Sequence, residues 1–335
     1  MRYASLDGLR AIAAYTVVIS HFSNRTKIYG GVLGEGAGQL GVMVFFTLSG
    51  FLMARLYLAE TPTAANIGEF ARRRVARVVP LYLVVVILAF LLTLLVGSSF
   101  PFVKIDTANL LAHLLFWQGA SVLWTVPVEM QFYLAFPLIW LLHARLGRRV
   151  VVLLGLVIAA LLLLPDLEFP VLLRYAPFFM AGVIASFVPR LSQTLAGDLA
   201  FLACCVCYVL LFPRIAIQFG IAPADMWSSL IYLIFVPVFL LAALNSPLAG
   251  RLLGGSAGHF LGAISYSVYL LHLPVLVVAS RLGWLDAANI VSLVVYLGAV
   301  TLVSWASFET IERGGKKLVG SLLRPVRRSI PRPAE

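Results

Sequence analysis

The sequence predicts an all-α, polytopic membrane protein with about ten transmembrane helices. Of its 335 residues, 61% are hydrophobic and only 12% are charged, which is about half the charged fraction of a typical soluble domain. The mean hydropathy is +1.00. The apolar stretches approach the roughly 20 residues that a helix needs to cross a bilayer, and they lack the alternation of barrel strands. These observations together define the fold class.

Ten apolar stretches are candidate spans. They are 7–23, 40–58, 78–97, 124–143, 150–164, 172–188, 199–213, 227–245, 260–280 and 285–308. A further apolar stretch, 108–120, is too short to cross a hydrocarbon core of about 30 Å. We therefore expect 108–120 to form one re-entrant or interfacial segment.

Basic residues give the spans a direction. With ten spans and a cytoplasmic N-terminus, 18 Lys and Arg side chains fall on the cytoplasmic side and 6 fall outside. This bias obeys the positive-inside rule, whereas an eleventh span at 108–120 would move several basic clusters outside. We expect both termini to be cytoplasmic. The net charge of +11 lies in short clusters between apolar segments, which favours loops at a membrane over nucleic-acid binding.

The chain divides into one membrane domain and a tail. We expect residues 1–313 to form a single membrane-embedded domain, because no linker of low complexity interrupts them. Residues 314–335 are basic and contain prolines, so we expect a disordered cytoplasmic tail along anionic membrane lipids.

Two ionisable residues share one face of the first span. Arg10 and His21 are eleven positions apart, which on a helix means nearly the same azimuth and roughly 16 Å along the axis. Ionisable groups inside a membrane usually face a protein interior or a wet cavity. The pair therefore indicates a site that reaches across part of the bilayer.

Further motifs follow this pair in order. They are Leu6-Asp-Gly-Leu-Arg10 with His21, Gly41-Val42, the stretch 45–52 (FFTLSGFL), Arg74-Val-Ala-Arg77, Trp124-Thr125, the stretch 128–133 (VEMQFY) and the stretch 265–274 (SYSVYLLHLP). In this order the set resembles the acyltransferase-3 family of integral-membrane enzymes, which acylate, and most often O-acetylate, glycans. The resemblance covers residues 5–313.

The resemblance implies a reaction and a location. It implies an acyl-CoA donor, in most cases acetyl-CoA, that arrives from the cytoplasm, and no metal. It implies a carbohydrate acceptor, such as a cell-surface, exported or lipid-linked glycan, at or beyond the outer face. It also implies a place in the inner (plasma) membrane of a bacterium.

Two residues are candidates for the reaction itself. In the ten-span topology, His21 lies near the outer end of the first span and Glu129 lies about five residues into the fourth, so we expect similar depths. A carboxylate beside an imidazole fixes its tautomer and stabilises the imidazolium. We expect His21 to act as the general base, with Glu129 orienting it or positioning the acceptor.

Three arginines are candidates for donor binding. Arg74 and Arg77 lie at i, i+3 on one helix face, where two guanidinium groups can clamp phosphates. Arg10 lies near the inner end of its span, where it can meet the phosphates or the pantetheine arm. The alternative for Arg10 is a structural ion pair with a carboxylate, namely Asp7, Glu309 or Glu312.

Three aromatic or imidazole residues are candidates for the acceptor path. Tyr269 and His272 lie at i, i+3 in the ninth span, and Trp124 lies in its own motif at the start of the fourth. For Tyr269 and His272, packing within a helix kinked at Pro274 is the alternative. Ser49 beside Gly50 is expected to be structural, because its surroundings lack the turn that exposes a nucleophilic serine.

Two positions depart from the family pattern. Met43 stands where an acidic residue is common in the family. The stretch 308–313 (FETIER) replaces a commoner Glu-x-Pro-x-Arg-like pattern, which leaves the role of Glu309 open.

The sequence also leaves other functional classes open. The five histidines are scattered, and no HExxH or paired-cysteine motif indicates a metal site. A transporter or flippase for glycans or small solutes would equally need buried charges around a cavity. A binding scaffold without catalysis would make His21 and Glu129 dispensable.

Overall fold

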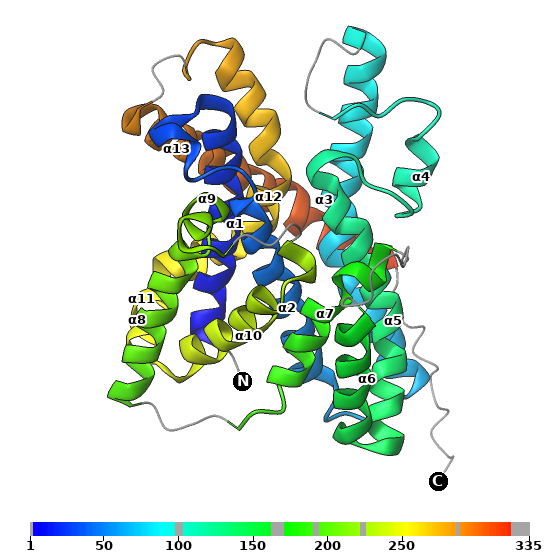
Figure 1. Ribbon diagram of the computed structural model, residues 1–335. Helices are drawn as coiled ribbons and strands as arrows, with labels where there is room; N and C mark the ends of the chain where they lie inside the picture. The colour runs from blue at the N-terminus through cyan, green and yellow to red at the C-terminus, as the bar shows by residue number, and fades with distance from the viewer. Residues whose placement is uncertain are drawn as a thin grey trace, which may run out of the picture.

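Helices form the whole regular structure of the described residues. The computed structural model describes residues 3–97, 103–161, 171–189, 194–221, 226–285 and 289–322, and no strand occurs among them (Figure 1). The main helices are α1 (Ala4–Thr26), α2 (Ala37–Tyr57), α3 (Ala64–Val96), α5 (Thr125–Leu146), α6 (Arg148–Leu161), α7 (Val171–Ala185), α8 (Leu195–Leu210), α10 (Leu230–Asn245), α12 (Ser256–Arg281) and α13 (Ile290–Ser307). Each of these ten corresponds to one predicted span, which confirms the all-α class.

Fewer helices than expected have the length and composition of a membrane span. Five qualify among the described residues, or up to seven if each of two bent pairs counts as one. The pairs join α8 to the segment Pro213–Phe219, which includes α9 (Pro213–Ala216), and α10 to α11 (Pro247–Leu253), with bends of 86° and 91°. Polar residues of α1, Arg10 and His21 among them, lower its hydropathy. Helices α6 and α7 border residues 162–170, which lie outside the described residues and include the end of the expected span 150–164.

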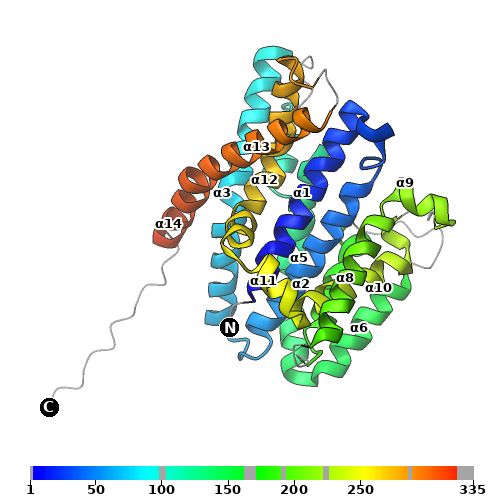
Figure 2. The same cartoon turned by 90° about the vertical axis from the view of Figure 1, so that its left-hand side faces the viewer.

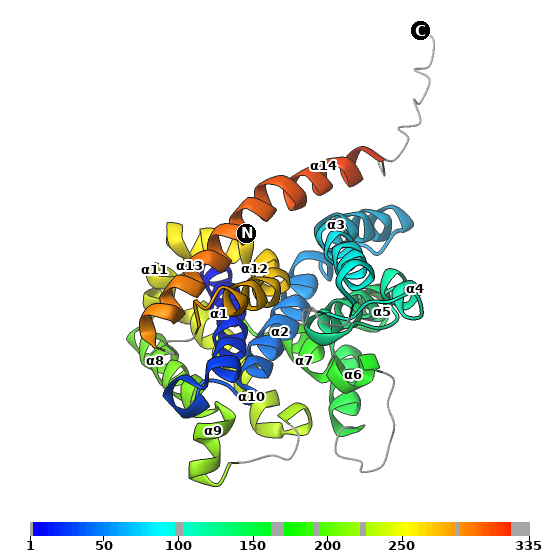
Figure 3. The ribbon, with the colours of Figure 1, turned by 90° about the horizontal axis from the view of Figure 1, so that it is seen from above.

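Close backbone contacts hold α1 between two neighbours. A Cβ atom at Gly41 of α2 would lie 2.5 Å from the carbonyl oxygen of Ala13, and one at Gly262 of α12 would lie 2.2 Å from that of Asp7. Small residues allow helices in a membrane to approach in this way. Figure 3 shows α1 and α2 near the centre of the bundle with the other helices around them.

The segment after α3 turns back along that helix. It contains the five-residue α4 (Leu110–Leu114), too short to span, which agrees with the expected re-entrant or interfacial segment. The Tyr82 hydroxyl donates to the carbonyl oxygen of His113 at 3.1 Å, and the Tyr82 ring stacks on Phe116. Tyr82 lies 14 residues before the end of α3, which is about 21 Å along the helix. The chain therefore re-enters the bundle before α5 begins.

Basic residues form contacts at both ends of the bundle. At the end where α1 begins, here called the N-terminal end, Arg55 donates to the hydroxyl of Tyr3 at 2.8 Å. At the opposite end, Arg25 donates to Ser280 Oγ at 2.8 Å and Arg214 forms an ion pair with Glu35.

The segment after α13 differs from the expected tail. A π-helical turn (Phe308–Glu312) leads into α14 (Arg313–Leu322), so residues 314–322 are helical where disorder was expected. Helix α14 packs on α3, where Gly315 approaches the ring of Pro80. Helix α14 runs away from the rest of the bundle (Figure 2). Residues 323–335 lie outside the described residues.

Candidate active site

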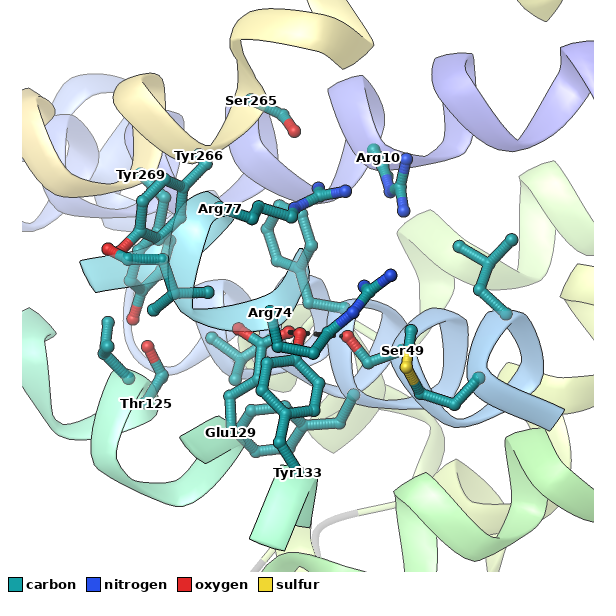
Figure 4. Close-up of a pocket in the computed structure, with 17 residues that line it drawn as sticks. Arg10, Ser49, Arg74, Arg77, Thr125, Glu129, Tyr133, Ser265, Tyr266 and Tyr269 are labelled. Atoms are coloured by element: carbon teal, nitrogen blue, oxygen red, sulfur yellow. Dashed lines mark hydrogen bonds between the residues drawn. The ribbon is translucent and has the colours of Figure 1, made fainter. Parts of the chain in front are cut away.

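A cavity lies between α1, α2, α3, α5 and α12. Its empty volume is about 700 Å³, including the space at its mouth (Figure 4). The polar side chains that line it are Arg10, Ser49, Arg74, Arg77, Thr125, Glu129, Tyr133, Ser265, Tyr266 and Tyr269. We call this space the central cavity. Apolar side chains, including Phe45 and Phe46, complete its walls.

A second cavity joins it at the N-terminal end. This inner-end cavity has an empty volume of about 1050 Å³ and is lined by residues that include Tyr3, Asp7 and Arg55. Arg10, Arg74 and Arg77 line both cavities. The three predicted donor-binding arginines therefore meet at the junction of the two spaces.

The three guanidinium groups have few partners in the protein. Arg10 Nη1 lies 3.6 Å from Asp7 Oδ1. Of the three carboxylates considered as ion-pair partners of Arg10, Asp7 is therefore the one that it contacts. Arg74 lies over the Tyr133 ring, with 5.7 Å between the guanidinium carbon and the ring centroid, and its Nε is buried without a hydrogen-bond partner. Within the described part of the chain, Arg74 and Arg77 form no ion pair. The junction is thus a cationic site with unused hydrogen-bond donors.

Glu129 lies in the central cavity with these arginines. Its Oε1 atom accepts hydrogen bonds from Ser49 Oγ at 2.7 Å and from the hydroxyl of Tyr133. Sequence reasoning did not single out Tyr133, although the i, i+4 spacing from Glu129 in α5 places both on one helix face. The hydrogen bond of Ser49 ties α2 to α5, and the structural role expected for Ser49 stays a prediction.

The structure does not place Glu129 beside His21. No contact within the described ranges joins the two, and His21 does not line the central cavity. The expected depth was counted from the membrane surface, whereas the segment 103–124 returns along α3 before α5 begins. Glu129 instead lines the central cavity, as Arg10 and Tyr269 do.

His21 instead lies next to His272. The two ring centroids are 5.1 Å apart, and the planes are tilted by 45°. His272 is fully buried, and its Nδ1 lies 2.6 Å from the carbonyl oxygen of Tyr269. The Tyr269 ring lies 5.9 Å from that of His272 and also lines the central cavity. Tyr269 therefore stands between the cavity and the histidine pair.

Trp124 packs in a separate aromatic cluster and does not line either cavity. Its ring centroid lies 4.6 Å from that of Tyr175 and 5.7 Å from that of Trp227, with Phe46 at 6.0 Å. Phe46 connects this cluster to the central cavity.

The two departures from the family pattern have different surroundings. Met43 is fully buried in the apolar core. Glu309 forms a surface ion pair with Arg313 at 2.5 Å. Glu312 is the buried acid of this segment, with 2.6 Å between its Oε1 and Ser267 Oγ.

No group of three or more His, Cys, Asp or Glu in the described ranges could hold a metal ion.

This arrangement can be compared with known families. The model of the acyltransferase-3 family, which is described as an acyltransferase domain, matches residues 3–309. The chain belongs to this family. The match confirms the resemblance that the motifs indicate.

Curated relatives agree with the family. The chain is 23% identical to the peptidoglycan O-acetyltransferase OatA of Listeria monocytogenes, over 92% of this chain and 55% of the relative. It is 27% identical to the O-acetyltransferase OatA of Staphylococcus aureus, over 81% of this chain and 50% of the relative. The chain thus spans about half the length of these relatives. No solved structure matches it.

Proposed function

We propose that this chain transfers an acetyl group from acyl-CoA to a hydroxyl of a cell-envelope carbohydrate such as peptidoglycan. The acyltransferase family and the relatives named as O-acetyltransferases support the reaction class. The observation that carries the donor assignment is the meeting of Arg10, Arg74 and Arg77 at the junction of the two cavities.

The arginine junction suits the phosphate groups of acyl-CoA. Guanidinium groups bind phosphate through paired, charge-assisted hydrogen bonds. Among the described residues, Arg10 alone of the three forms an ion pair, with Asp7, and the buried Nε of Arg74 is unused. The inner-end cavity gives access from the N-terminal end. We assign that end to the cytoplasm of a bacterial inner membrane because the topology expected from the sequence puts the N-terminus and 18 of the Lys and Arg side chains on the cytoplasmic side.

The central cavity then holds the pantetheine arm. With the phosphates at the junction, the arm runs between the apolar walls around Phe45 toward Tyr269 and brings the thioester near the histidine pair. The helix rise between Arg10 and His21, roughly 16 Å, is the length that this arm has to cover. The Ser49 hydroxyl is engaged in its hydrogen bond to Glu129, so direct transfer fits better than an acyl-serine.

The transfer requires one base. The carbohydrate hydroxyl attacks the thioester carbonyl carbon while His21 takes the hydroxyl proton. A new C–O bond forms, the C–S bond breaks, and the leaving thiolate of CoA receives the proton. Tyr269 bounds the reacting space, with the buried His272 behind it. Phe46 links the central cavity to the aromatic cluster of Trp124, where the sugar ring approaches from the opposite end. Glu129 acts as a positioning residue of the donor cavity through Ser49 and Tyr133.

The test is transfer of label from acetyl-CoA to a glycan. The purified full-length chain in lipid nanodiscs is mixed with radiolabelled acetyl-CoA and soluble peptidoglycan fragments, and the label in the glycan is counted. We expect base-labile label with the wild-type chain and at least a hundredfold less with His21→Ala. A Cys205→Ala protein is the control, since this thiol lies in α8 away from both cavities. Full transfer by His21→Ala would contradict the assignment of the base, and glycan movement across the membrane without acetylation would favour a transporter.

A further inference from the structure

The hydrogen bond of His272 determines which of its nitrogens is free. Its Nδ1 lies 2.6 Å from the carbonyl oxygen of Tyr269, and a carbonyl oxygen only accepts hydrogen bonds. Nδ1 therefore carries the hydrogen, and in the neutral ring Nε2 carries the lone pair. This Nε2 is buried and has no hydrogen-bond partner among the described residues. A buried acceptor without a partner is costly unless the protein uses it.

The nearest imidazole is that of His21. In an N–H···N hydrogen bond of about 3 Å, with each nitrogen about 1.1 Å from its ring centre, two imidazole centroids lie about 5 Å apart. The observed separation of His21 and His272 is 5.1 Å. The two rings are therefore at the separation of a hydrogen-bonded imidazole pair.

His272 is held more firmly than His21. The hydroxyl of Tyr296 donates to the backbone carbonyl of His272 at 3.0 Å, and the Tyr296 ring stacks on Phe22, the residue after His21. Tyr269, which accepts from the His272 ring, is itself held by a 2.9 Å hydrogen bond to the carbonyl oxygen of Val122. His21 is only partly buried. His272 is thus the fixed member of the pair, and His21 is the one that adapts.

We propose that His272 is a positioning residue that fixes the tautomer and orientation of His21, which rests on the proposed function. Its Nε2 accepts the N–H of one His21 nitrogen, so that the other His21 nitrogen keeps its lone pair for the proton of the acceptor hydroxyl. Once His21 is protonated, the same N–H donates to His272 and stabilises the imidazolium until the proton passes to the CoA thiolate. This is the role that the sequence predicted for Glu129.

A neutral imidazole suits this position in a membrane protein. A buried carboxylate without a cation beside it carries a large desolvation cost, whereas a neutral ring supplies an acceptor without a buried charge. The arginines that accompany Glu129 in the central cavity do not extend to the histidine pair.

The test compares two replacements of His272. His272→Gln keeps a carbonyl acceptor near the position of Nε2 but cannot take up a proton. His272→Leu fills a similar space without any acceptor. We expect the Gln protein to retain at least a tenth of the wild-type kcat for acetyl transfer and the Leu protein to lose a hundredfold or more. The KM for acetyl-CoA should stay within twofold of wild type in both.

A matched histidine provides the control. His143 stacks on Phe187 near the end of α5, outside both cavities, so His143→Gln and His143→Leu should leave kcat unchanged. Acetyl-CoA binding and the melting temperature report whether each variant folds. If His272→Leu does not fold, His272→Met supplies the same apolar replacement in a more adaptable shape.

Two results would overturn the proposal. Equal, nearly full activity of the folded Gln and Leu proteins would show that His272 only packs, and an equally complete loss in both would show that its ring itself takes up the proton. These results are distinct from a failure of the proposed function, in which His21→Ala would keep full activity or wild type would transfer no label.

Discussion

Ser49 on α2 donates a hydrogen bond to Glu129 on α5, with 2.7 Å between Ser49 Oγ and Glu129 Oε1. This bond crosses the central cavity and joins two of the helices that form its walls. Tyr133 donates to the same oxygen from one turn further along α5. The carboxylate therefore holds the shape of the cavity that we assign to the donor.

Removing this carboxylate should cost more stability than neutralising it. Glu129→Ala leaves the hydroxyls of Ser49 and Tyr133 without their acceptor, which should cost about 1–3 kcal/mol of unfolding free energy. Glu129→Gln keeps an acceptor oxygen and should cost less than half as much. Thermal unfolding in one detergent measures both. A hundredfold loss of kcat in the Gln protein with unchanged stability would instead favour a role in proton transfer.

The arginine junction should determine donor affinity. Arg74→Ala removes a guanidinium from the junction, and we expect at least a tenfold rise in the Kd of CoA, measured by isothermal calorimetry in nanodiscs. Arg74→Lys should recover only part of the affinity, because an ammonium cannot form the paired hydrogen bonds of a guanidinium.

Arg73 is the matched control for that measurement. It is the neighbouring arginine of α3, but it forms an ion pair with Glu69 at 2.7 Å and lines neither cavity. Arg73→Ala should change the Kd of CoA less than twofold. Equal effects at positions 73 and 74 would indicate a general effect of charge rather than a defined site.

The contact between α2 and α7 should tolerate no added methyl group. A Cβ at Gly50 would lie 1.9 Å from the carbonyl oxygen of Phe179, so Gly50→Ala should force the helices apart and cost about 3 kcal/mol or more. Gly68 in α3 has open space around its Cβ position. Gly68→Ala should therefore be neutral or stabilise by up to about 1 kcal/mol. Melting temperatures of the two proteins, compared with wild type, test the pair.

The link between the α1–α2 loop and α9 should weaken in acid. The hydrogen bond from Arg214 holds the pKa of the exposed Glu35 carboxyl below its ordinary value, with a further contribution from the charge of Arg214. Such a group stabilises the fold fully above the ordinary Glu pKa of about 4.3, and the contribution is lost as the pH falls through the lower folded value.

Hydrogen exchange can follow this link. Amides of the segment 28–36 should be protected at neutral pH and lose protection below about pH 4. Glu35→Gln should show the low protection at every pH. Protection in the Gln protein equal to that of wild type at pH 7 would show that the ion pair does not hold the loop.

The arginine junction was predictable from sequence, whereas the histidine pair was not. Arg74 and Arg77 are one helical turn apart, and Arg10 has a fixed height on its own helix, so local periodicity places all three near one end. The contact of His21 with His272 depends on how α1 packs against α12 through Gly262, which periodicity does not reveal.

The position of Glu129 was also not predictable from periodicity. Its depth was counted from an assumed start of α5 at the membrane surface. The actual start depends on the contact of Tyr82 with His113, which joins residues 31 positions apart. Span counting treats every helix as straight and full length, so it missed this contact and the bends that follow α8 and α10.

The spacing of Arg10 and His21 along α1 bears on how deep the proposed donor has to reach. With the donor phosphates at Arg10 and the reacting centre at His21, the chemistry spans roughly 16 Å, about half of a hydrocarbon core of about 30 Å. A nucleotide can then stay on its own side while the flexible arm alone bridges the gap. On the proposed function, such a protein needs no alternating-access cycle, because only the arm of the donor enters the bundle.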